Sequence, residues 1–80
     1  MTGAALVDAL SGHGLDAFEW GDGQVEVTVA VSATVDPDGT VEVLIVTRDE
    51  GDDIVATQVV AVVPAADAPA LIARLCAGAP

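Results

Sequence analysis

The chain has 80 residues and a mass of 7.9 kDa, which suits one small domain over residues 1–80 and excludes a second. Hydrophobic residues make up 52% of it, so the chain is too apolar to stay disordered despite its net charge of -11. Thirteen acidic residues face only two cations, Arg48 and Arg74. This balance disfavours direct binding to nucleic acid or to an anionic membrane surface.

The expected location follows from the hydropathy pattern and the cysteine content. The longest apolar stretch, near residues 59–63, falls far short of the roughly 20 residues that a membrane span needs. The N-terminal segment has no basic region and too short an apolar stretch for a secretory signal. Cys76 is the only cysteine, so no disulfide can form within the chain. We therefore expect a cytoplasmic protein that does not associate with membranes.

The composition predicts a core of low volume. Alanine and valine supply most of the hydrophobic residues, and Phe18 and Trp20 are the only aromatic ones. Small side chains bury little area each, at about 25 cal/mol per Å², so a lone 80-residue core built from them is marginal and a second polypeptide would help to cover it. The two aromatics are two residues apart and point the same way if extended, either into the core or toward a basic partner.

The first predicted elements are a short helix and a long strand. Thr2 can cap a helix that runs to Leu10, and the glycines that follow can end it. From Gly23 onward valines alternate with polar or small residues. This period of two predicts a single half-buried strand over residues 25–35.

A hairpin is predicted next. The sequence Asp-Pro-Asp-Gly at residues 36–39 fits a three-residue loop, because proline suits the first turn position and glycine the left-handed one. If Asp36 faces Thr40, one face of the hairpin carries the pairs Val35–Val41, Ala33–Val43, Val31–Ile45 and Val29–Thr47. The opposite face mixes polar residues with Leu44 and Val46, so it is not a clean solvent face.

Residues 54–63 predict a third strand that is apolar at odd and even positions alike, which is typical of a strand covered on both sides. In a simple meander this strand lies at an open edge, where an apolar unpaired backbone invites another chain. Asp67 can then cap a closing helix that ends at Gly78 and has an apolar face of Ala68, Leu71, Ile72 and Leu75. The expected fold is α+β: a short N-terminal helix, a three-stranded antiparallel meander sheet and a C-terminal helix packed on the sheet.

Residues that could carry out catalysis are scarce. His13 lies between two glycines in an expected exposed loop, and Cys76 is expected to be a buried small hydrophobe on the last helix. No nucleophile, base and orienting group come together, so we expect no enzyme activity and no cofactor. The acidic residues of 36–39 and 49–53 could attract Ca²⁺, but ordinary turn chemistry explains both segments and a calcium site needs six to eight oxygen ligands.

The sequence favours a non-catalytic protein-protein interaction module, small, acidic and homodimeric, that docks onto a protein partner. The dimer interface is expected on the apolar residues that two short helices leave uncovered, namely Leu44, Val46, Ile54, Val60 and Val62. A basic protein partner is expected at the aromatic and acidic residues Phe18, Trp20, Asp49, Glu50, Asp52 and Asp53.

Two alternative functions stay open. Carboxylates set in a row could imitate phosphates, as in a phage-type decoy that inhibits a nuclease, and acidic loops could bind a metal ion. The chain direction of the meander places Asp22 with residues 49–53 at one end of the sheet, and Asp36, Asp38 and Asp67 at the other. An acidic surface that merely reflects a halophilic or GC-rich host is a third explanation of the charge.

Overall fold

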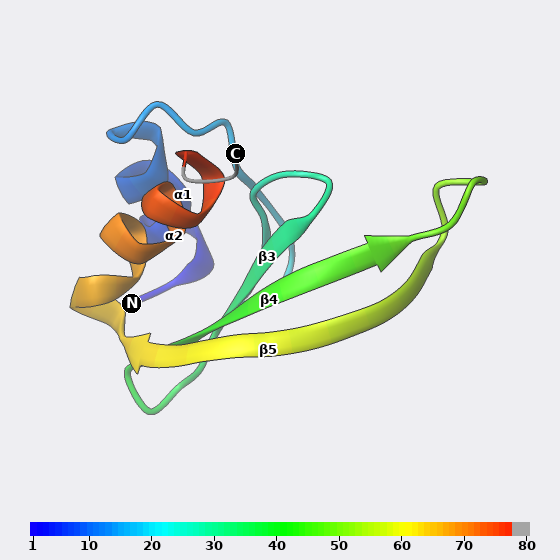
Figure 1. The fold of residues 1–80 in the computed structure, drawn as a ribbon. Helices are drawn as coiled ribbons and strands as arrows, with labels where there is room; N and C mark the ends of the chain where they lie inside the picture. Colours follow the sequence, from blue (N-terminus) through cyan, green and yellow to red (C-terminus); the bar gives the residue numbers. More distant parts are fainter. Residues whose placement is uncertain (78–80) are drawn as a thin grey trace.

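The computed structural model describes residues 1–77, and its two α-helices lie on one face of a five-stranded antiparallel sheet (Figure 1). Helix α1 (Gly3–Ser11) begins where the sequence predicts, because the Thr2 hydroxyl accepts the N–H of Ala5 at 3.1 Å. Among residues 1–77, none of the helices combines the length and apolar character needed to cross a membrane.

The sheet is larger than the predicted three strands. Its order is β1 (Phe18–Gly21), β2 (Gln24–Glu26), β3 (Val31–Val35), β4 (Thr40–Arg48) and β5 (Ile54–Pro64), each antiparallel to the next. The α+β class, the antiparallel sheet and the two flanking helices are confirmed, whereas the number of strands was wrong.

The single strand predicted over residues 25–35 is in fact a hairpin. The chain reverses after Val27, whose N–H bonds to the carbonyl of Val31 at 3.0 Å. The Thr28 hydroxyl supports the reversal by accepting the N–H groups of Ala30 at 3.2 Å and Val31 at 3.1 Å. Val29 therefore lies in a loop and is 68% exposed instead of pairing with Thr47.

The next hairpin has the predicted register. The N–H of Asp36 bonds to the carbonyl of Thr40 at 2.9 Å, and Gly39 adopts the left-handed conformation with φ at 91°. The predicted pairs Val35–Val41, Ala33–Val43 and Val31–Ile45 are all present. Turn chemistry and hydrophobic alternation both act locally here, so the sequence is sufficient to specify the pairing.

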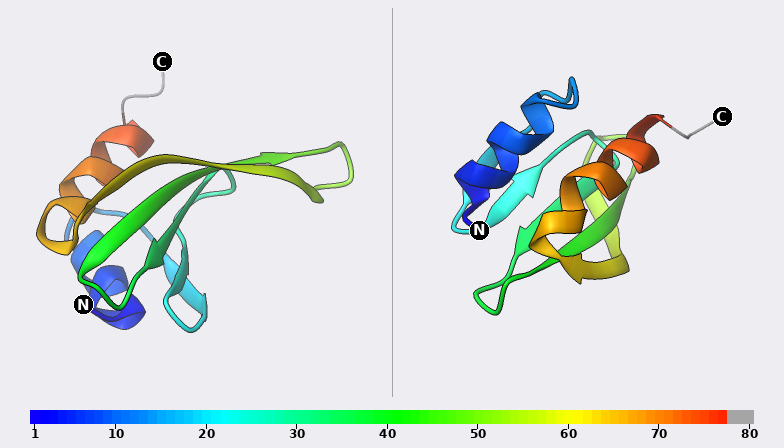
Figure 2. Two further views of the ribbon diagram at one scale, coloured as in Figure 1. Left: turned by 90° about the horizontal axis from the view of Figure 1, so that it is seen from below. Right: turned by 90° about the vertical axis from the view of Figure 1, so that its left-hand side faces the viewer.

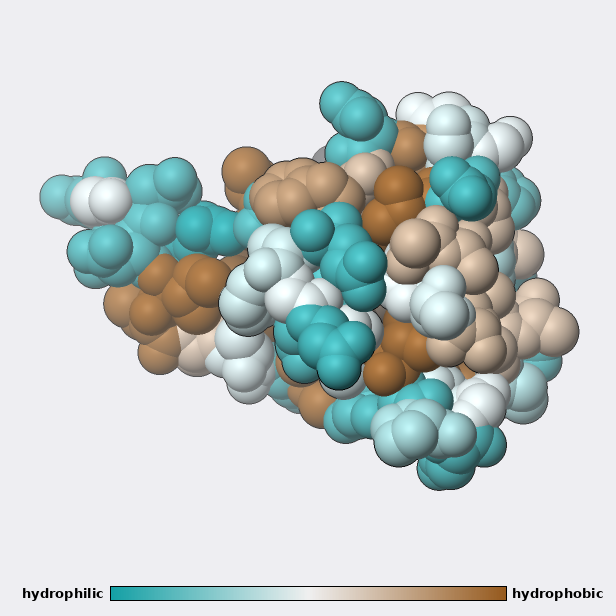
Figure 3. Space-filling model, turned by 180° about the vertical axis from the view of Figure 1, so that it is seen from behind, coloured by the Kyte–Doolittle hydropathy of each residue, from teal (hydrophilic) through white to brown (hydrophobic). Residues whose placement is uncertain are grey.

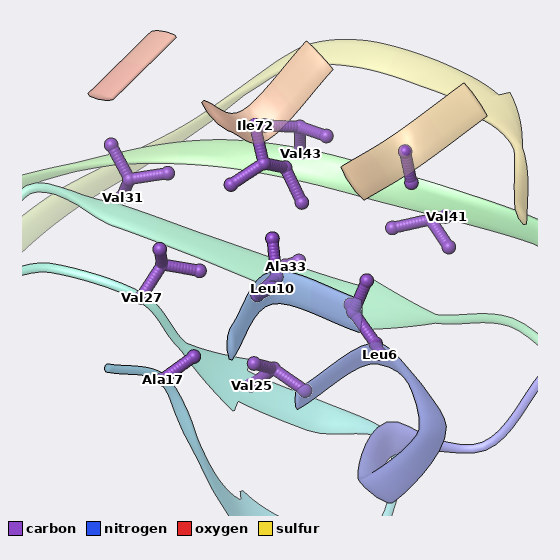
Figure 4. Close-up of a cluster of buried hydrophobic side chains, with 11 residues drawn as sticks. Leu6, Leu10, Ala17, Val25, Val27, Val31, Ala33, Val41, Val43 and Ile72 are labelled. Atoms are coloured by element: carbon purple, nitrogen blue, oxygen red, sulfur yellow. The ribbon is translucent and has the colours of Figure 1, made fainter. Parts of the chain in front are cut away.

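The core lies between the helices and the middle strands of the sheet (Figure 4). Leu6 and Leu10 of α1 meet Ile72 of α2 (Ala68–Ala77), and all three side chains are fully buried. The remaining buried positions come mainly from the strands and adjoining loops, namely Ala17, Val25, Val27, Val31, Ala33, Val41 and Val43. Small side chains thus form most of the core, as the composition indicates.

The end of the chain differs slightly from the prediction. Residues Ala65–Asp67 form a 3-10 turn (η1) that leads directly into α2, so Asp67 lies within the helical segment rather than at its cap. The expected apolar face of α2 is present, with Ala68 and Ile72 buried and Leu71 and Leu75 half-buried. Gly78, the predicted end of this helix, lies outside the described residues.

Both helices gather at one end of the sheet (Figures 1 and 2). Strand β3 pairs with β4 only as far as Ile45, so beyond that point β4 has a full strand partner only in β5. Residues 46–57 consequently form a protruding hairpin, which we call the β4–β5 arm. The arm has no helix over either face, as the left view of Figure 2 shows.

Candidate interaction surface

Strand β5 is an edge of the sheet and leaves most of its large apolar side chains exposed. Ile54, Val55 and Val62 are exposed by 55, 59 and 59%, while Val59 and Val60 are each 45% exposed. We call these five residues the β5 strip. Apolar atoms adjoin the hydrophilic tip of the arm (Figure 3). An apolar strip on an unpaired strand edge is typical of a surface that another polypeptide covers.

The lengths of the elements explain why the helix-side face of β5 is covered along only part of the strand. Helix α2 has 10 residues and so spans about 15 Å at 1.5 Å per residue. Strand β5 has 11 residues and extends for about 36 Å at 3.3 Å per residue. The helix therefore covers less than half of the strand, and the half next to α2, with Ala61 and Val63, is the half that is partly buried.

The register assigns the strip to particular faces. Ile54 pairs with Arg48, Val59 with Leu44 and Val62 with Glu42, and these positions of β4 point away from the helices. Two register shifts add Val55 and Val60 as extra residues on β5. Such bulges strengthen the local twist of a strand pair. The strip therefore follows the helix-free face and the outer edge together.

The residues expected at a dimer interface are distributed unevenly. Ile54, Val60 and Val62 belong to the β5 strip, and Leu44 is half-buried beside Val59. Val46 is only 7% exposed, so little of its side chain is left for a partner to contact. Sequence reasoning missed Val55 and Val59, although both lie in the stretch of β5 that is apolar at consecutive positions.

Arg48 fixes the point at which the arm leaves the sheet. Its Nε–H donates to the carbonyl of Val29 at 2.8 Å, and its Nη1 donates to the carbonyl of Asp52 at 3.1 Å. Its Nη2 lies 3.4 Å from Glu26 Oε1, so the same side chain also reaches β2. A guanidinium can hold three acceptors at once because its donors form a rigid fork. Arg48 thus joins the β2–β3 loop, strand β2 and the tip of the arm.

The tip of the arm carries the four expected acidic residues. Asp49 organises the turn, because its Oδ1 accepts the N–H of Gly51 at 2.9 Å and of Asp53 at 3.0 Å. Asp52 has a φ of 64°, which an aspartate tolerates better than most residues. Glu50 and the other side chains of the turn are exposed to solvent. Turn chemistry is a sufficient reason for Asp49, and the tip is a strongly negative protrusion.

A second acidic group, which includes Asp22, Asp36 and Asp38, lies at the opposite end of β4, about 26 Å away for the eight residue-to-residue steps of this nine-residue strand. The sequence placed Asp22 near the arm tip, and this placement was wrong. Because the chain reverses at residues 28–30, the turn before β2 lies beside the turn after β3, and the N–H of Val35 bonds to the carbonyl of Gly23 at 2.8 Å. A surface hollow there is lined in part by Glu19, Asp22 and Asp36.

Two carboxyl groups of this end have shifted pKa values. A hydrogen bond with Asp36, together with repulsion from Asp36 and Asp38, raises the pKa of Glu42. The Thr40 hydroxyl donates to Asp38 at 2.6 Å, and this bond, with the N–H of Thr40, lowers the pKa of Asp38. Negative charge is therefore crowded at Glu42 and compensated by hydrogen bonds at Asp38.

Phe18 and Trp20 do not plug the core. They are exposed by 53 and 63% on β1, which is the other edge of the sheet. Glu19 pairs with Val25, which faces the helices. Phe18 directly precedes Glu19, so its side chain points to the face without helices. The aromatics thus lie at the edge opposite the β5 strip, with Trp20 beside Asp22 and Phe18 paired with Glu26, whereas the acidic tip with which the sequence grouped them joins β4 to β5.

The remaining candidates for chemistry lie apart from one another. His13 is exposed in the turn after α1, and Cys76 is half-buried on α2, where burial raises the pKa of its thiol. Within residues 1–77, no three His, Cys, Asp or Glu side chains are grouped so that they could hold a metal ion.

No protein-family model, no curated protein and no solved structure matches this chain. What the protein does must therefore be inferred from its own surface, whose most unusual feature is the β5 strip.

Proposed function

We propose that this protein is a non-catalytic interaction module that associates with a second copy through β5 and docks onto a basic protein partner. The exposed β5 strip is the observation that carries the first part of the proposal. Its five side chains lie together on an edge strand, and no residue from Ile54 to Pro64 is charged, so nothing on this strand opposes contact with an identical strand.

The free energy available at the strip is large enough for association. Complete burial of a valine or isoleucine side chain contributes about 1.5–3 kcal/mol. The five residues are each about half exposed, so covering them completely contributes at most about 4–7 kcal/mol per copy and twice that for a symmetric pair. This sum is comparable with the cost of association, about 4–15 kcal/mol. A standard interface of about 800 Å² per copy would take roughly a sixth of the 4724 Å² of accessible surface.

Sedimentation equilibrium across a concentration series tests this association, with one variant and one matched control. Val60→Lys places an ammonium group on the strip and should weaken self-association by at least about tenfold, because an edge lysine opposes strand pairing. Val29→Lys makes the same change at a valine that is 68% exposed in the β2–β3 loop and should leave association intact. A wild-type chain that stays monomeric at high concentration would overturn the proposal.

The basic partner is assigned to the β1 edge. Trp20 is exposed there beside Asp22, and Phe18 is exposed opposite Glu26. Aromatic rings near carboxylates suit lysine and arginine side chains, which gain both cation–π and charge contacts. Trp20 is the only tryptophan, so its emission reports on this edge alone. We expect a lysine- and arginine-rich peptide to change the emission in a salt-dependent way, and a glutamate-rich peptide of equal length to leave it unchanged. Identical titrations would remove this part of the proposal.

A further inference from the structure

The β5 edge has a sequence and register that restrict how a second copy can pair with it. We propose, building on the self-association above, that two copies join antiparallel through β5 around a two-fold axis at Gln58. The product is one continuous sheet of ten strands in which each β5 lies in the interior. The free edges of that sheet are then the two β1 strands, which are only four residues long, and short edges are less prone to further pairing.

Charge selects the antiparallel direction. The acidic tip immediately precedes Ile54, and its carboxylates are Asp49, Glu50, Asp52 and Asp53. Parallel pairing in register would set two such tips side by side, so that eight carboxylates would repel one another. Antiparallel pairing around Gln58 puts Asp53 and the partner's Asp53 ten strand positions apart, or about 33 Å. That separation is about four Debye lengths at physiological ionic strength.

The faces of the strand select the register. Around Gln58, Ile54 lies opposite the partner's Val62, and Thr57 lies opposite the partner's Val59. The β4 partners of these four residues are Arg48, Glu42, Val46 and Leu44, which all occupy the helix-free face. Residues opposite each other in an antiparallel pair share a face, so this register joins the strips of the two copies into one apolar row.

Neighbouring registers are worse. A slip of one residue would place the side chains on the helix-free face of one strand opposite residues whose side chains point to the other face of the sheet. Moving the axis to Thr57 sets Val62 opposite the partner's Asp52, which places a carboxylate beside an apolar side chain. Moving it to Val59 sets Ile54 opposite the partner's Pro64, which has no N–H to donate. The Gln58 register also places each of the two bulge residues opposite an alanine. Val55 lies opposite the partner's Ala61, and Val60 lies opposite the partner's Ala56.

Interchain disulfides test this arrangement directly. In a Cys76→Ser background the chain has no other thiol, so single cysteines report one position each. Opposed residues of an antiparallel pair have Cα atoms about 4.5–5.5 Å apart, which is within disulfide range. Gln58→Cys should therefore cross-link with itself under mild oxidation. Ile54→Cys and Val62→Cys should cross-link when mixed at least about tenfold more than either does alone. Thr47→Cys, exposed on β4 away from the edge, is the control and should not cross-link.

The possible outcomes separate this inference from the proposed function. If Ile54→Cys and Val62→Cys each cross-link alone, the strands pair in parallel and the inference is wrong. If the chain is dimeric by sedimentation but none of the cysteines on β5 cross-links, the copies associate through another surface, so the β5 pairing falls while self-association stands. If the chain is monomeric, both fall. Far-ultraviolet circular dichroism establishes that each variant is folded.

Discussion

Arg48 links three segments, so its replacement tests whether the arm is held in place by hydrogen bonds or only by strand pairing. The side chain is 20% exposed and lies between Val29, Asp52 and Glu26. Arg48→Ala removes all of these contacts, whereas Arg48→Lys keeps the positive charge. A lysine carries its three N–H donors on one nitrogen, so it cannot occupy the three separate positions from which Nε, Nη1 and Nη2 of Arg48 donate.

The structure gives the size of the expected loss. The two hydrogen bonds to carbonyl groups contribute about 0.5–1.5 kcal/mol each, and the ion pair with Glu26, whose carboxylate side chain is 33% exposed, contributes at most about 1 kcal/mol. Arg48→Ala should therefore lower the free energy of unfolding by about 2–3 kcal/mol and Arg48→Lys by about half of that. For a domain of this size 1 kcal/mol corresponds to about 4–8 °C.

Thermal melts at one fixed protein concentration measure the loss, because self-association would otherwise change Tm. Amide hydrogen exchange at Val46, whose N–H bonds to the carbonyl of Ala30 at 2.8 Å, measures whether the β2–β3 loop separates from β4. Arg74→Ala removes the other cation of the chain from an exposed position on α2 and should cost less than about 1 kcal/mol. If both Arg48 variants melt within 2 °C of the wild type, the assignment of Arg48 as the link between these segments is wrong.

Three further predictions concern stability. Ile72→Ala should cost about 2–5 kcal/mol in urea unfolding and Ile72→Val about 0.5–1.5 kcal/mol, since Ile72 is fully buried; equal losses would contradict its packing in the core. Glu42 has a pKa above its usual value of 4.5 in the folded chain, so its ionised form is destabilising above the folded pKa and this effect is lost as pH falls through it. Glu42→Gln should accordingly raise Tm at pH 7 and change nothing well below pH 4.5, and a gain that persists in acid would exclude the repulsion from Asp36 as the cause. Added salt should raise Tm because 13 carboxylates face two cations, and a flat curve from low to moderate ionic strength would mean that these charges are already well separated.

The sequence allowed a correct prediction where one short segment contains all the hydrogen-bonding groups that form the structure. The Thr2 cap requires only the hydroxyl and the N–H of Ala5, and the hairpin turn requires only the five residues from Asp36 to Thr40. Neither depends on the rest of the chain. The C-terminal helix was also found, because its apolar face repeats at helical spacing.

The number of strands could not be counted from the alternation of valines. A period of two satisfies one long strand and two short strands equally well, and the reversal at Thr28 depends on side-chain bonds to Ala30 and Val31. Strand β1 was missed because it holds only four residues, although Asp22-Gly23 is a known hairpin signal and Gly23 has a φ of 74°. The reversal at residues 28–30 also places Asp22 at the end of the sheet opposite the arm tip.

The candidate surface was partly visible in the sequence. The apolar character of residues 54–63 predicted a strand that another chain covers, and that interpretation remains a proposal. The burial of Val46 and the exposure of Phe18 and Trp20 were not visible, because each depends on which distant segments of the chain come to lie over that side chain.

The sequence by itself determined the α+β class, the two helices, the 36–39 hairpin with its register and the uncharged apolar character of β5, because each follows from neighbouring residues. Only the tertiary structure decided that the sheet has five strands, that the aromatics lie at one edge and that the β5 strip lies at the other. The physical reason is that both helices lie on one face of the sheet and are short: helices of about 15 Å cannot cover a strand of about 36 Å, and the opposite face of β5 has no helix over it (Figure 1).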